Sequence, residues 1–124
     1  MQTERERKVQ ERTLRIVRKY GGYIYKNAQN IYTEKGRPDL AACIPTNLDT
    51  IIKLIDEGFL TKDIGLFVGI ELKREGHLSE VSEAQQIVGK KIKKAKGIWL
   101  AIDDTDVIEL LCQKLTGGII DDEV

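Results

Sequence analysis

Three charged side chains in two short apolar segments have the types and the spacing of a hydrolytic metal site. Asp39 opens the first segment, and Glu71 and Lys73 stand two positions apart in the second. Because successive side chains of a β-strand alternate between faces, Glu71 and Lys73 are expected to share one face. Ile70 and Leu72 are expected on the opposite face, in the core. The pattern therefore predicts one chemical face and one packing face on the same strand.

The chemistry that these residue types favour is metal-assisted hydrolysis of a phosphodiester. Two carboxylates from neighbouring strands suit Mg²⁺, which binds one or two carboxylates and keeps several water molecules. A nearby lysine can orient or deprotonate the attacking water and offset charge that grows on a phosphate. Each part alone has a plainer interpretation, because Pro-Asp is a common turn and Glu-x-Lys is usually a solvated strand face. The order and the apolar setting of Asp39, Glu71 and Lys73 favour the chemical interpretation.

The wider motif pattern resembles that of a known nuclease family. It consists of Gly36-x-Pro38-Asp39, then Val68-Gly69-Ile70-Glu71-Leu72-Lys73, then Leu78-Ser79 and Ser82-x-x-Gln85 ahead of a basic helix and a closing strand. This pattern is similar to the VRR-NUC (virus-type replication-repair nuclease) group of the PD-(D/E)xK nucleases, from about residue 6 to about residue 110. One departure is the segment from Pro45 to Gly65, which is longer than the tight hairpin of many relatives.

The resemblance implies a single nuclease domain over residues 1–124 that cleaves DNA with Mg²⁺ or Mn²⁺ and uses no organic cofactor. It implies Asp39 and Glu71 as metal ligands, Lys73 as a catalytic residue and Gln85 as an accessory. The backbone carbonyl of Leu72 is a further candidate ligand. Stand-alone members of this group are typically phage or bacterial and resemble Holliday junction resolvases. Branched DNA in the cytoplasm of a bacterium or a bacterial host is therefore the expected substrate.

A further acid lies on the first predicted helix, Glu4 to Tyr20. At about 100° per residue, Glu6 falls within about 40° of the mean direction of the apolar side chains, whereas Glu11 lies almost opposite. Related nucleases carry an active-site glutamate on this helix. We therefore expect Glu6, rather than Glu11, to face inward and to support the metal directly or through water. The plainer interpretation of Glu6 is a terminal residue without a role. The apolar stripe comprises Val9, Thr13, Ile16, Val17 and Tyr20.

Gln85 has two interpretations that do not exclude each other. It is the third residue after Ser82, so it can close a capping box at the start of a helix. In the family pattern the same glutamine projects toward the Lys73 side of the site, where it could position water or phosphate. Gln86 is the weaker candidate for that second role.

The formal net charge is zero, but the charges are segregated along the chain. Residues 1–37 hold ten Lys and Arg against four Glu, and residues 90–96 form a second basic block. Such a block creates a local positive field for a phosphate backbone even where the total charge vanishes. The alternative is a solvated helix face without a partner. The residues expected to contact the DNA backbone without reading bases are Arg37, Lys90, Lys91, Lys93 and Lys94.

Length and composition argue against several other classes. The 124 residues suffice for one domain with one core. Cys43 and Cys112 each lie in an apolar run, which predicts reduced, buried thiols and no disulfide framework. The only histidine, His77, has no partner at zinc-ligand spacing, so a structural zinc site is not expected. The charged start and the lack of a long apolar stretch predict neither a signal peptide nor a membrane span.

Hydrophobic periodicity and turn residues predict the element order α-β-β-(α)-β-α-β-α, with the bracketed helix inserted. Strands are expected at 23–26, 40–44, 66–73 and 98–102, and helices at 4–20, at 48–57, from Ser79 or Ser82 to about Lys96, and from Asp104 or Thr105 to about Gly117. The order predicts an α/β fold with a mixed sheet flanked by helices, in agreement with a restriction-endonuclease-like core.

Structure-selective cleavage of branched DNA such as Holliday junctions is the favoured function, because no module for base readout is appended. A site-specific restriction-type nuclease would share the chemistry but would need such elements. A non-catalytic DNA-binding module with a relic fold would be expected to lose one of the three site residues. We also expect a homodimer, since two symmetric cuts require two sites. Its candidate surfaces are Ile51, Ile52, Leu54 and Ile55 of the inserted helix and the last helix with its Ile119-Ile120 extension.

Overall fold

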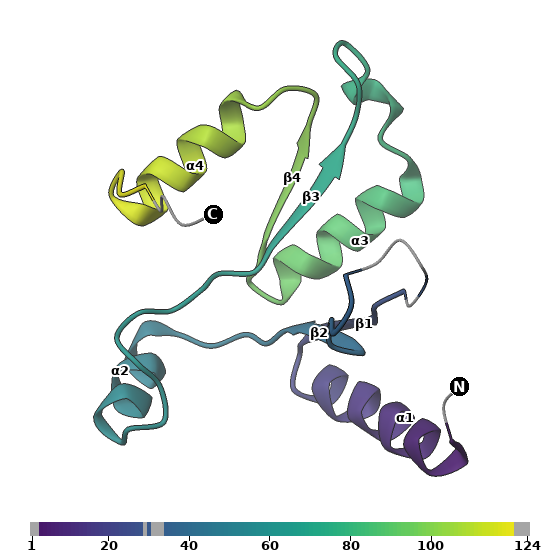
Figure 1. The fold of residues 1–124 in the computed structure, drawn as a ribbon, viewed down its shortest axis with the longest axis vertical. Coiled ribbons are helices and arrows are strands. Elements are labelled where there is room, and N and C mark those ends of the chain that lie inside the picture. Colours follow the sequence, from purple (N-terminus) through teal and green to yellow (C-terminus); the bar gives the residue numbers. More distant parts are fainter. Residues whose placement is uncertain (1–2, 29, 31–33, 121–124) are drawn as a thin grey trace.

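The computed structural model describes residues 3–28, 30 and 34–120, and its elements follow the predicted order (Figure 1). The helices are α1 (Glu4–Lys19), α2 (Leu48–Asp56), α3 (Glu83–Lys94) and α4 (Asp106–Thr116), with a short 3₁₀ helix η1 (Leu78–Glu80) ahead of α3. The strands are β1 (Tyr23–Lys26), β2 (Leu40–Cys43), β3 (Val68–Leu72) and β4 (Ile98–Ile102). The α/β class is therefore confirmed. No described helix has the length and the apolar content needed to cross a membrane.

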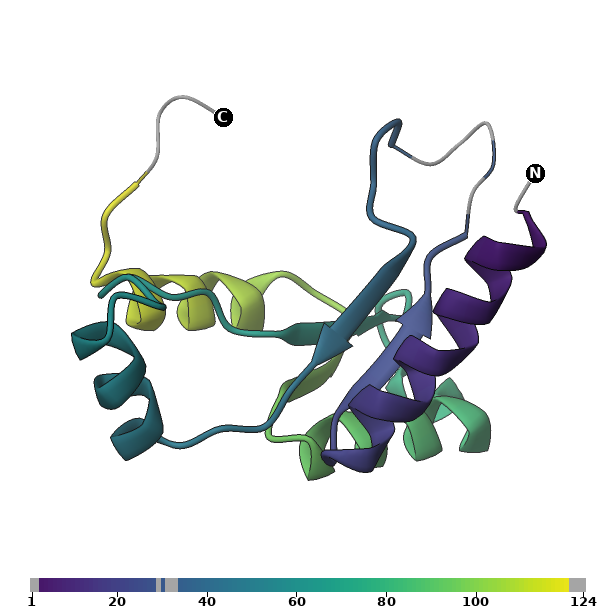
Figure 2. The same cartoon turned by 90° about the horizontal axis from the view of Figure 1, so that it is seen from below.

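The strands form two small sheets, whereas we predicted one mixed sheet. β1 and β2 pair antiparallel, with Tyr23 opposite Cys43. β3 and β4 pair parallel, with Val68 opposite Ile98, and α3 supplies the crossover connection that a parallel pair requires. The connection from β2 to β3 does not form a hairpin, because it is the long segment that carries α2. We call this segment the arm (residues 44–67). In Figures 1 and 2, α2 lies where the arm extends farthest from the strands.

α3 is held against the β3–β4 sheet by a close approach at Gly89. A Cβ atom at this position would lie 2.6 Å from the Trp99 ring, so only glycine permits the observed packing. Lys93 places its Nζ over the same ring, 5.6 Å from the centroid. Ile92, on the next part of the helix, is buried with 4% of its surface exposed. This packing fixes the start of α3, including Gln85, relative to β3.

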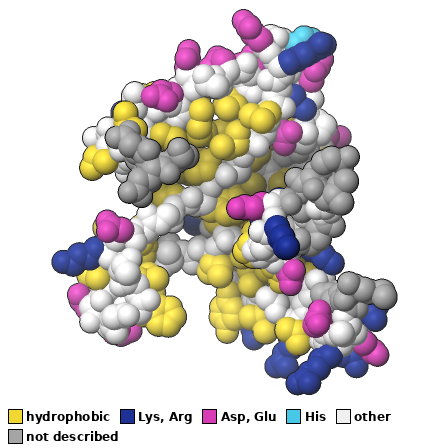
Figure 3. Space-filling model, viewed as in Figure 1, with side chains coloured by type: hydrophobic (Ala, Val, Ile, Leu, Met, Phe, Trp, Pro, Cys, Tyr) yellow, Lys and Arg dark blue, Asp and Glu magenta, His cyan; other side chains and the backbone are white. Residues whose placement is uncertain are grey.

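The other face of the β3–β4 sheet is open, which corrects a prediction. Ile70 and Leu72 are 44% and 69% exposed and do not lie in a core. α3 covers the opposite face, and α4 packs only loosely on the sheet among the described elements. Figure 3 shows apolar side chains gathered on the surface over this region. Cys112 of α4 is also exposed, contrary to the prediction, whereas Cys43 of β2 is buried as predicted.

α1 is capped at both ends but buries little of its apolar stripe. The Thr3 hydroxyl accepts a hydrogen bond from the Glu6 amide at 3.1 Å, and the predicted Gly21-Gly22 pair ends the helix, with Gly21 at φ +84°. The helix packs on β1, yet Val9 remains 61% exposed. Glu6 is exposed as well, so the prediction that it faces a buried core was wrong. Its surroundings are those of a surface cavity.

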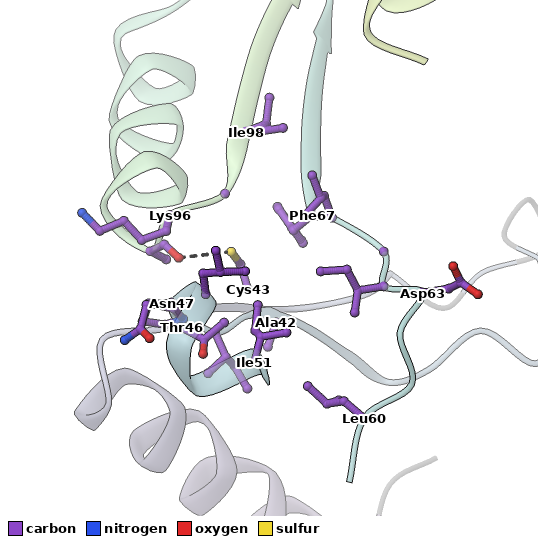
Figure 4. A pocket seen from close by; sticks show the side chains of 18 of the residues that line it. Ala42, Cys43, Thr46, Asn47, Ile51, Leu60, Asp63, Phe67, Lys96 and Ile98 are labelled. Carbon is purple, nitrogen blue, oxygen red and sulfur yellow. Dashed lines mark hydrogen bonds between the residues drawn. The ribbon is translucent and has the colours of Figure 1, made fainter. Parts of the chain in front are cut away.

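A cavity of about 880 Å³ lies between the arm and the rest of the chain (Figure 4). Ile51 of α2, Leu60 and Phe67 of the arm, and Cys43 of β2 contribute to its lining. The Cys43 thiol donates a hydrogen bond to the Ala95 carbonyl at 3.4 Å in its wall. None of the site residues predicted from the sequence lines it. Its lining is mostly apolar, which makes it a packing feature of the arm and not the chemical site.

Candidate active site

One group of predicted site residues converges on the carboxylate of Glu71; we call Glu71, Lys73 and Gln85 the strand group. Glu71 and Lys73 lie on the same face, as the strand alternation predicted, with Lys73 Nζ 4.0 Å from Glu71 Oε1. Gln85 Nε2 donates a hydrogen bond of 2.6 Å to the same oxygen. The side chains of Glu71 and Lys73 are only 30% and 19% exposed. Partial burial of the pair strengthens their electrostatic interaction relative to a fully solvated pair.

Gln85 forms the predicted capping box, and its side chain also reaches Glu71. Its Oε1 accepts a hydrogen bond from the Ser82 amide at 2.9 Å, and the Ser82 hydroxyl accepts one from the Gln85 amide at 3.1 Å. These two bonds form the predicted capping box and fix the side chain at the start of α3. The remaining amide nitrogen is the one that reaches Glu71. Gln86 instead donates to the Val81 carbonyl at 3.2 Å.

Lys73 stands just beyond β3, where the sheet still holds its backbone. Its amide donates to the Ile102 carbonyl at 2.9 Å, which continues the β3–β4 ladder by one residue. The turn that follows is closed by a second contact to the end of β4, since the Asp103 carboxylate accepts from the Gly76 amide at 3.0 Å. Both contacts keep the lysine from fraying away from Glu71 with the loop.

The second group, which we call the turn group, consists of Glu6, Arg37 and Asp39. Glu6 and Asp39 line one cavity of about 360 Å³ between α1 and the start of β2. Arg5, Val9 and Gln10 of α1 complete most of its wall. The cavity therefore brings the predicted helix acid and the predicted turn acid to one place. Glu11 does not line this cavity.

Both carboxylates retain oxygens that the protein does not use. The two contacts of Glu71 fall on Oε1, and Oε2 accepts no hydrogen bond within the described residues. The side chain of Asp39 forms no hydrogen bond or ion pair in the same part of the chain. The structure does not place three potential metal-binding side chains of the His, Cys, Asp and Glu types together among the described residues. Among the described residues, no hydrogen bond or ion pair joins the strand group to the turn group.

Asn27 is a polar residue of this region that the sequence reasoning missed. It follows β1, is only 6% exposed, and forms its hydrogen bonds with residues 37–39. Its place directly after a strand and opposite Asp39 in the extended β1–β2 register was the available signal. A polar residue in a polar loop gives no periodic pattern, so this signal is weak.

The predicted DNA-contacting side chains are exposed. Lys90, Lys91, Lys93 and Lys94 all lie on the solvent side of α3, and Arg37 lies beside Asp39 on the turn. Lys93 also forms a cation–π contact with the Trp99 ring. In comparisons with models of protein families, with curated proteins and with solved structures, no match to this chain was found.

Proposed function

We propose that this chain is a divalent-metal-dependent endonuclease of the PD-(D/E)xK type that cleaves branched DNA. The single observation that carries the proposal is the convergence of Lys73 and Gln85 on the Glu71 carboxylate. A carboxylate can bind the metal ion in metal-assisted phosphodiester hydrolysis, and a lysine and a side-chain amide beside it can position water and phosphate. The resemblance to the VRR-NUC pattern adds the restriction-endonuclease-like core as the proposed form of the fold. It also adds the cytoplasm of a bacterium or of a bacterial host as the proposed location.

Mg²⁺ or Mn²⁺ is the ion that we propose for the carboxylates of Asp39 and Glu71. Mg²⁺ takes one or two carboxylates and keeps its remaining ligands as water, so a cluster of three acidic side chains is not required. We assign to it Glu71 Oε2 and the Asp39 carboxylate, which have no hydrogen-bond partner among the described residues, with the Leu72 carbonyl as a further candidate. Glu6 lies on the wall of the cavity that it shares with Asp39, from which it would support the same ion directly or through water. When bound, the ion supplies Lewis-acid stabilisation of the transition state and acidifies a coordinated water molecule.

The chain's own residues perform three tasks in this proposal. Lys73 holds its ammonium group beside Glu71, where it orients the attacking water and offsets the negative charge that develops on the phosphate. Gln85 holds the Glu71 carboxylate in one orientation and leaves its second oxygen available. Arg37 contacts the phosphate backbone next to Asp39. Because these groups need no covalent intermediate, no nucleophilic Ser or Cys is required at the site.

The exposed lysines of α3 provide the nonspecific part of DNA binding. Their charges gather on one helix, so the local field attracts a phosphate backbone although the whole chain is neutral. Contacts of this type position the duplex and carry no sequence information. A structure-selective enzyme is therefore favoured over a site-specific restriction-type enzyme. The alternative of a non-catalytic relic is disfavoured by the intact set of Asp39, Glu71 and Lys73.

A homodimer is the assembly that the exposed surface favours. The chain exposes 10550 Å² at a mass of 14.0 kDa, whereas a folded monomer of that mass is expected to expose about 6,700 Å². The excess of about 3,900 Å² is more than one partner contributes to an obligate interface, which buries about 2,000–5,000 Å² in total, so contact with a second copy would cover part of it. Ile52 of α2 is 49% exposed, and Ile119 and Ile120 are each 81% exposed. We assign α2 and the segment after α4 to the contact with a second copy.

Light scattering at micromolar concentration tests this assembly, with Ile52→Asp as the disruptive variant. The wild-type chain is expected to have twice the monomer mass, and the variant is expected to dissociate. Lys53→Asp is the matched control, because it places the same charge on the exposed side of the same helix. A monomeric wild-type chain would contradict the proposed dimer.

A cleavage assay tests the enzymatic proposal. A four-way junction, a splayed arm and a linear duplex are incubated with the wild-type chain in Mg²⁺, in Mn²⁺ and in EDTA. We expect cleavage that requires the metal and is fastest on the four-way junction. Equal rates on all three substrates would reduce the proposal to a non-selective nuclease, and DNA binding without cleavage in any metal would favour the relic alternative.

A further inference from the structure

Asn27 is the one polar or charged residue that the described part of the chain buries, with 6% of its surface exposed. Burial of an amide costs free energy unless its donors and its acceptor find partners. The partners of Asn27 all belong to one short segment. Because that segment contains Arg37 and Asp39, the hydrogen bonds of Asn27 affect the positions of two residues of the turn group.

Three hydrogen bonds join Asn27 to consecutive residues of the turn. Its Nδ2 donates to the Pro38 carbonyl at 2.8 Å, and its Oδ1 accepts from Arg37 Nη2 at 3.0 Å. Its backbone amide donates to the Asp39 carbonyl at 2.9 Å, which extends the β1–β2 register by one pair. A single residue thus holds the backbone on both sides of the Pro38-Asp39 bond and the guanidinium next to it.

Chemistry fixes the orientation of this amide. A carbonyl can only accept and a guanidinium can only donate, so the amide nitrogen must face Pro38 and the amide oxygen must face Arg37. The reversed orientation would place two donors together at Arg37 and two acceptors together at Pro38. An aspartate at this position would keep the bond to Arg37 and lose the bond to Pro38. A leucine or an alanine would lose both bonds.

Few other hydrogen bonds fix the position of Asp39 within the described part of the turn. Pro38 has no amide hydrogen to donate, and the Asp39 side chain has no partner among the described residues. In the strand group, by contrast, Gln85 holds the Glu71 carboxylate directly. The direction of the Asp39 side chain therefore depends on the backbone that Asn27 fixes.

We propose that Asn27 is the positioning residue of the turn group, which aims the Asp39 carboxylate at the metal and holds the Arg37 guanidinium beside it for the phosphate. The proposal rests on the proposed nuclease function for its consequence in catalysis. The positioning itself is a property of the folded chain without metal or DNA. The two can therefore be tested separately.

The test compares the full-length chain with Asn27→Ala, Asn27→Asp and the control Asn47→Ala. Asn47 is the N-cap of α2, where its Oδ1 accepts from the Thr50 amide at 2.9 Å, so its replacement also removes an asparagine hydrogen bond but far from the turn along the chain. The first readout is hydrogen–deuterium exchange of the peptide that covers residues 36–42. Faster exchange in Asn27→Ala and not in Asn47→Ala supports the positioning role, and unchanged exchange overturns it.

The second readout is the affinity for Mn²⁺, measured by calorimetry without DNA. Loss of a residue that orients a metal ligand typically weakens metal binding about 10- to 100-fold. We expect a loss of at least about tenfold in Asn27→Ala, a smaller loss in Asn27→Asp, and none in Asn47→Ala. Wild-type affinity in Asn27→Ala, with only its melting temperature lowered, would show a merely structural role and overturn the proposal. If the wild-type chain binds no Mn²⁺, the nuclease proposal fails, and hydrogen exchange alone decides whether Asn27 positions the turn.

Discussion

Glu71 and Asp39 are both carboxylates at the ends of strands, yet the fold holds them in different ways. Glu71 lies on β3 and is held at its carboxylate by Gln85, which the capping box of α3 fixes in turn. Among the described residues, Asp39 is held through its backbone alone, by Asn27 from the end of β1. One acid is oriented directly and the other indirectly. A candidate site can therefore be assembled in two ways. Direct contact with the carboxylate, as at Glu71, is accompanied by a sequence motif, whereas contact with the backbone, as at Asp39, is not.

The largest expected effect comes from the strand group. Lys73→Ala should reduce cleavage at least about 100-fold, because a group that acts on the attacking water contributes about that factor or more. Its fold should be retained, since the Lys73 contact to the sheet is made by the backbone amide. Single-turnover cleavage of a four-way junction measures the loss. The control is Lys62→Ala, which removes an exposed lysine of the arm; a Lys73→Ala chain with more than about a tenth of the wild-type rate would exclude a catalytic lysine.

The two acids themselves provide the next comparison. Glu71→Gln and Asp39→Asn should each weaken Mn²⁺ binding, because each removes a charged oxygen donor. Their effects on stability in EDTA should differ. Glu71→Gln removes a partly screened ion pair with Lys73 and should cost about 0–1 kcal/mol, whereas Asp39→Asn removes no partner and should cost nothing measurable. Calorimetry and thermal unfolding test these outcomes, and unchanged Mn²⁺ affinity in both variants would mean that any metal binds elsewhere.

The packing beneath the strand group offers a mutation of smaller effect. Gly89→Ala places a Cβ atom 2.6 Å from the Trp99 ring, so α3 or the ring must move. We expect a loss of about 1–3 kcal/mol from overpacking, reduced by up to about 1 kcal/mol from the better helix propensity of alanine. Gly65→Ala is the control, because its Cβ would meet no atom within 4 Å. Equal melting temperatures for the two variants would show that α3 is not held as described.

The smallest effect concerns the two cysteines and pH. Burial raises the pKa of the Cys43 thiol from its ordinary value of 9.0, and burial together with Tyr25 raises the pKa of Tyr23 from 10.0. A raised pKa in the folded state stabilises the fold fully below the ordinary pKa, and this contribution is lost as the pH rises through the folded-state pKa. Stability should therefore decline above about pH 9, with a weaker decline in Cys43→Ala.

Iodoacetamide at pH 8 should modify exposed Cys112 first, and equal rates at both thiols would contradict the burial of Cys43.

The features that were predicted correctly from the sequence are those that local residue patterns determine. The order of the elements followed from hydrophobic periodicity and from turn residues such as Gly21-Gly22, and the Ser82–Gln85 capping box was recognised from its spacing. The shared face of Glu71 and Lys73 followed from strand geometry. These features depend on residues that are near one another in the chain.

The remaining errors concern packing between distant elements. Ile70 and Leu72 alternate as a buried face should, but no described helix covers them closely. Cys112 of α4 is also exposed, and Glu6 lies on a cavity wall and not in a core. Periodicity identifies which residues share a face and does not identify what lies against that face. Asn27 was missed for a related reason, because its partners lie ten to twelve positions away across a loop.

A crystal grown with Mn²⁺ tests whether Asp39 and Glu71 share one metal ion, because anomalous scattering locates the ion independently of activity. We expect an anomalous peak within coordination distance of both the Asp39 and the Glu71 carboxylates, with Lys73 and Gln85 beside it and not bound to it. A peak held by other residues, or no peak in a crystal that contains saturating Mn²⁺, would contradict the assignment of this site as a metal-dependent nuclease centre.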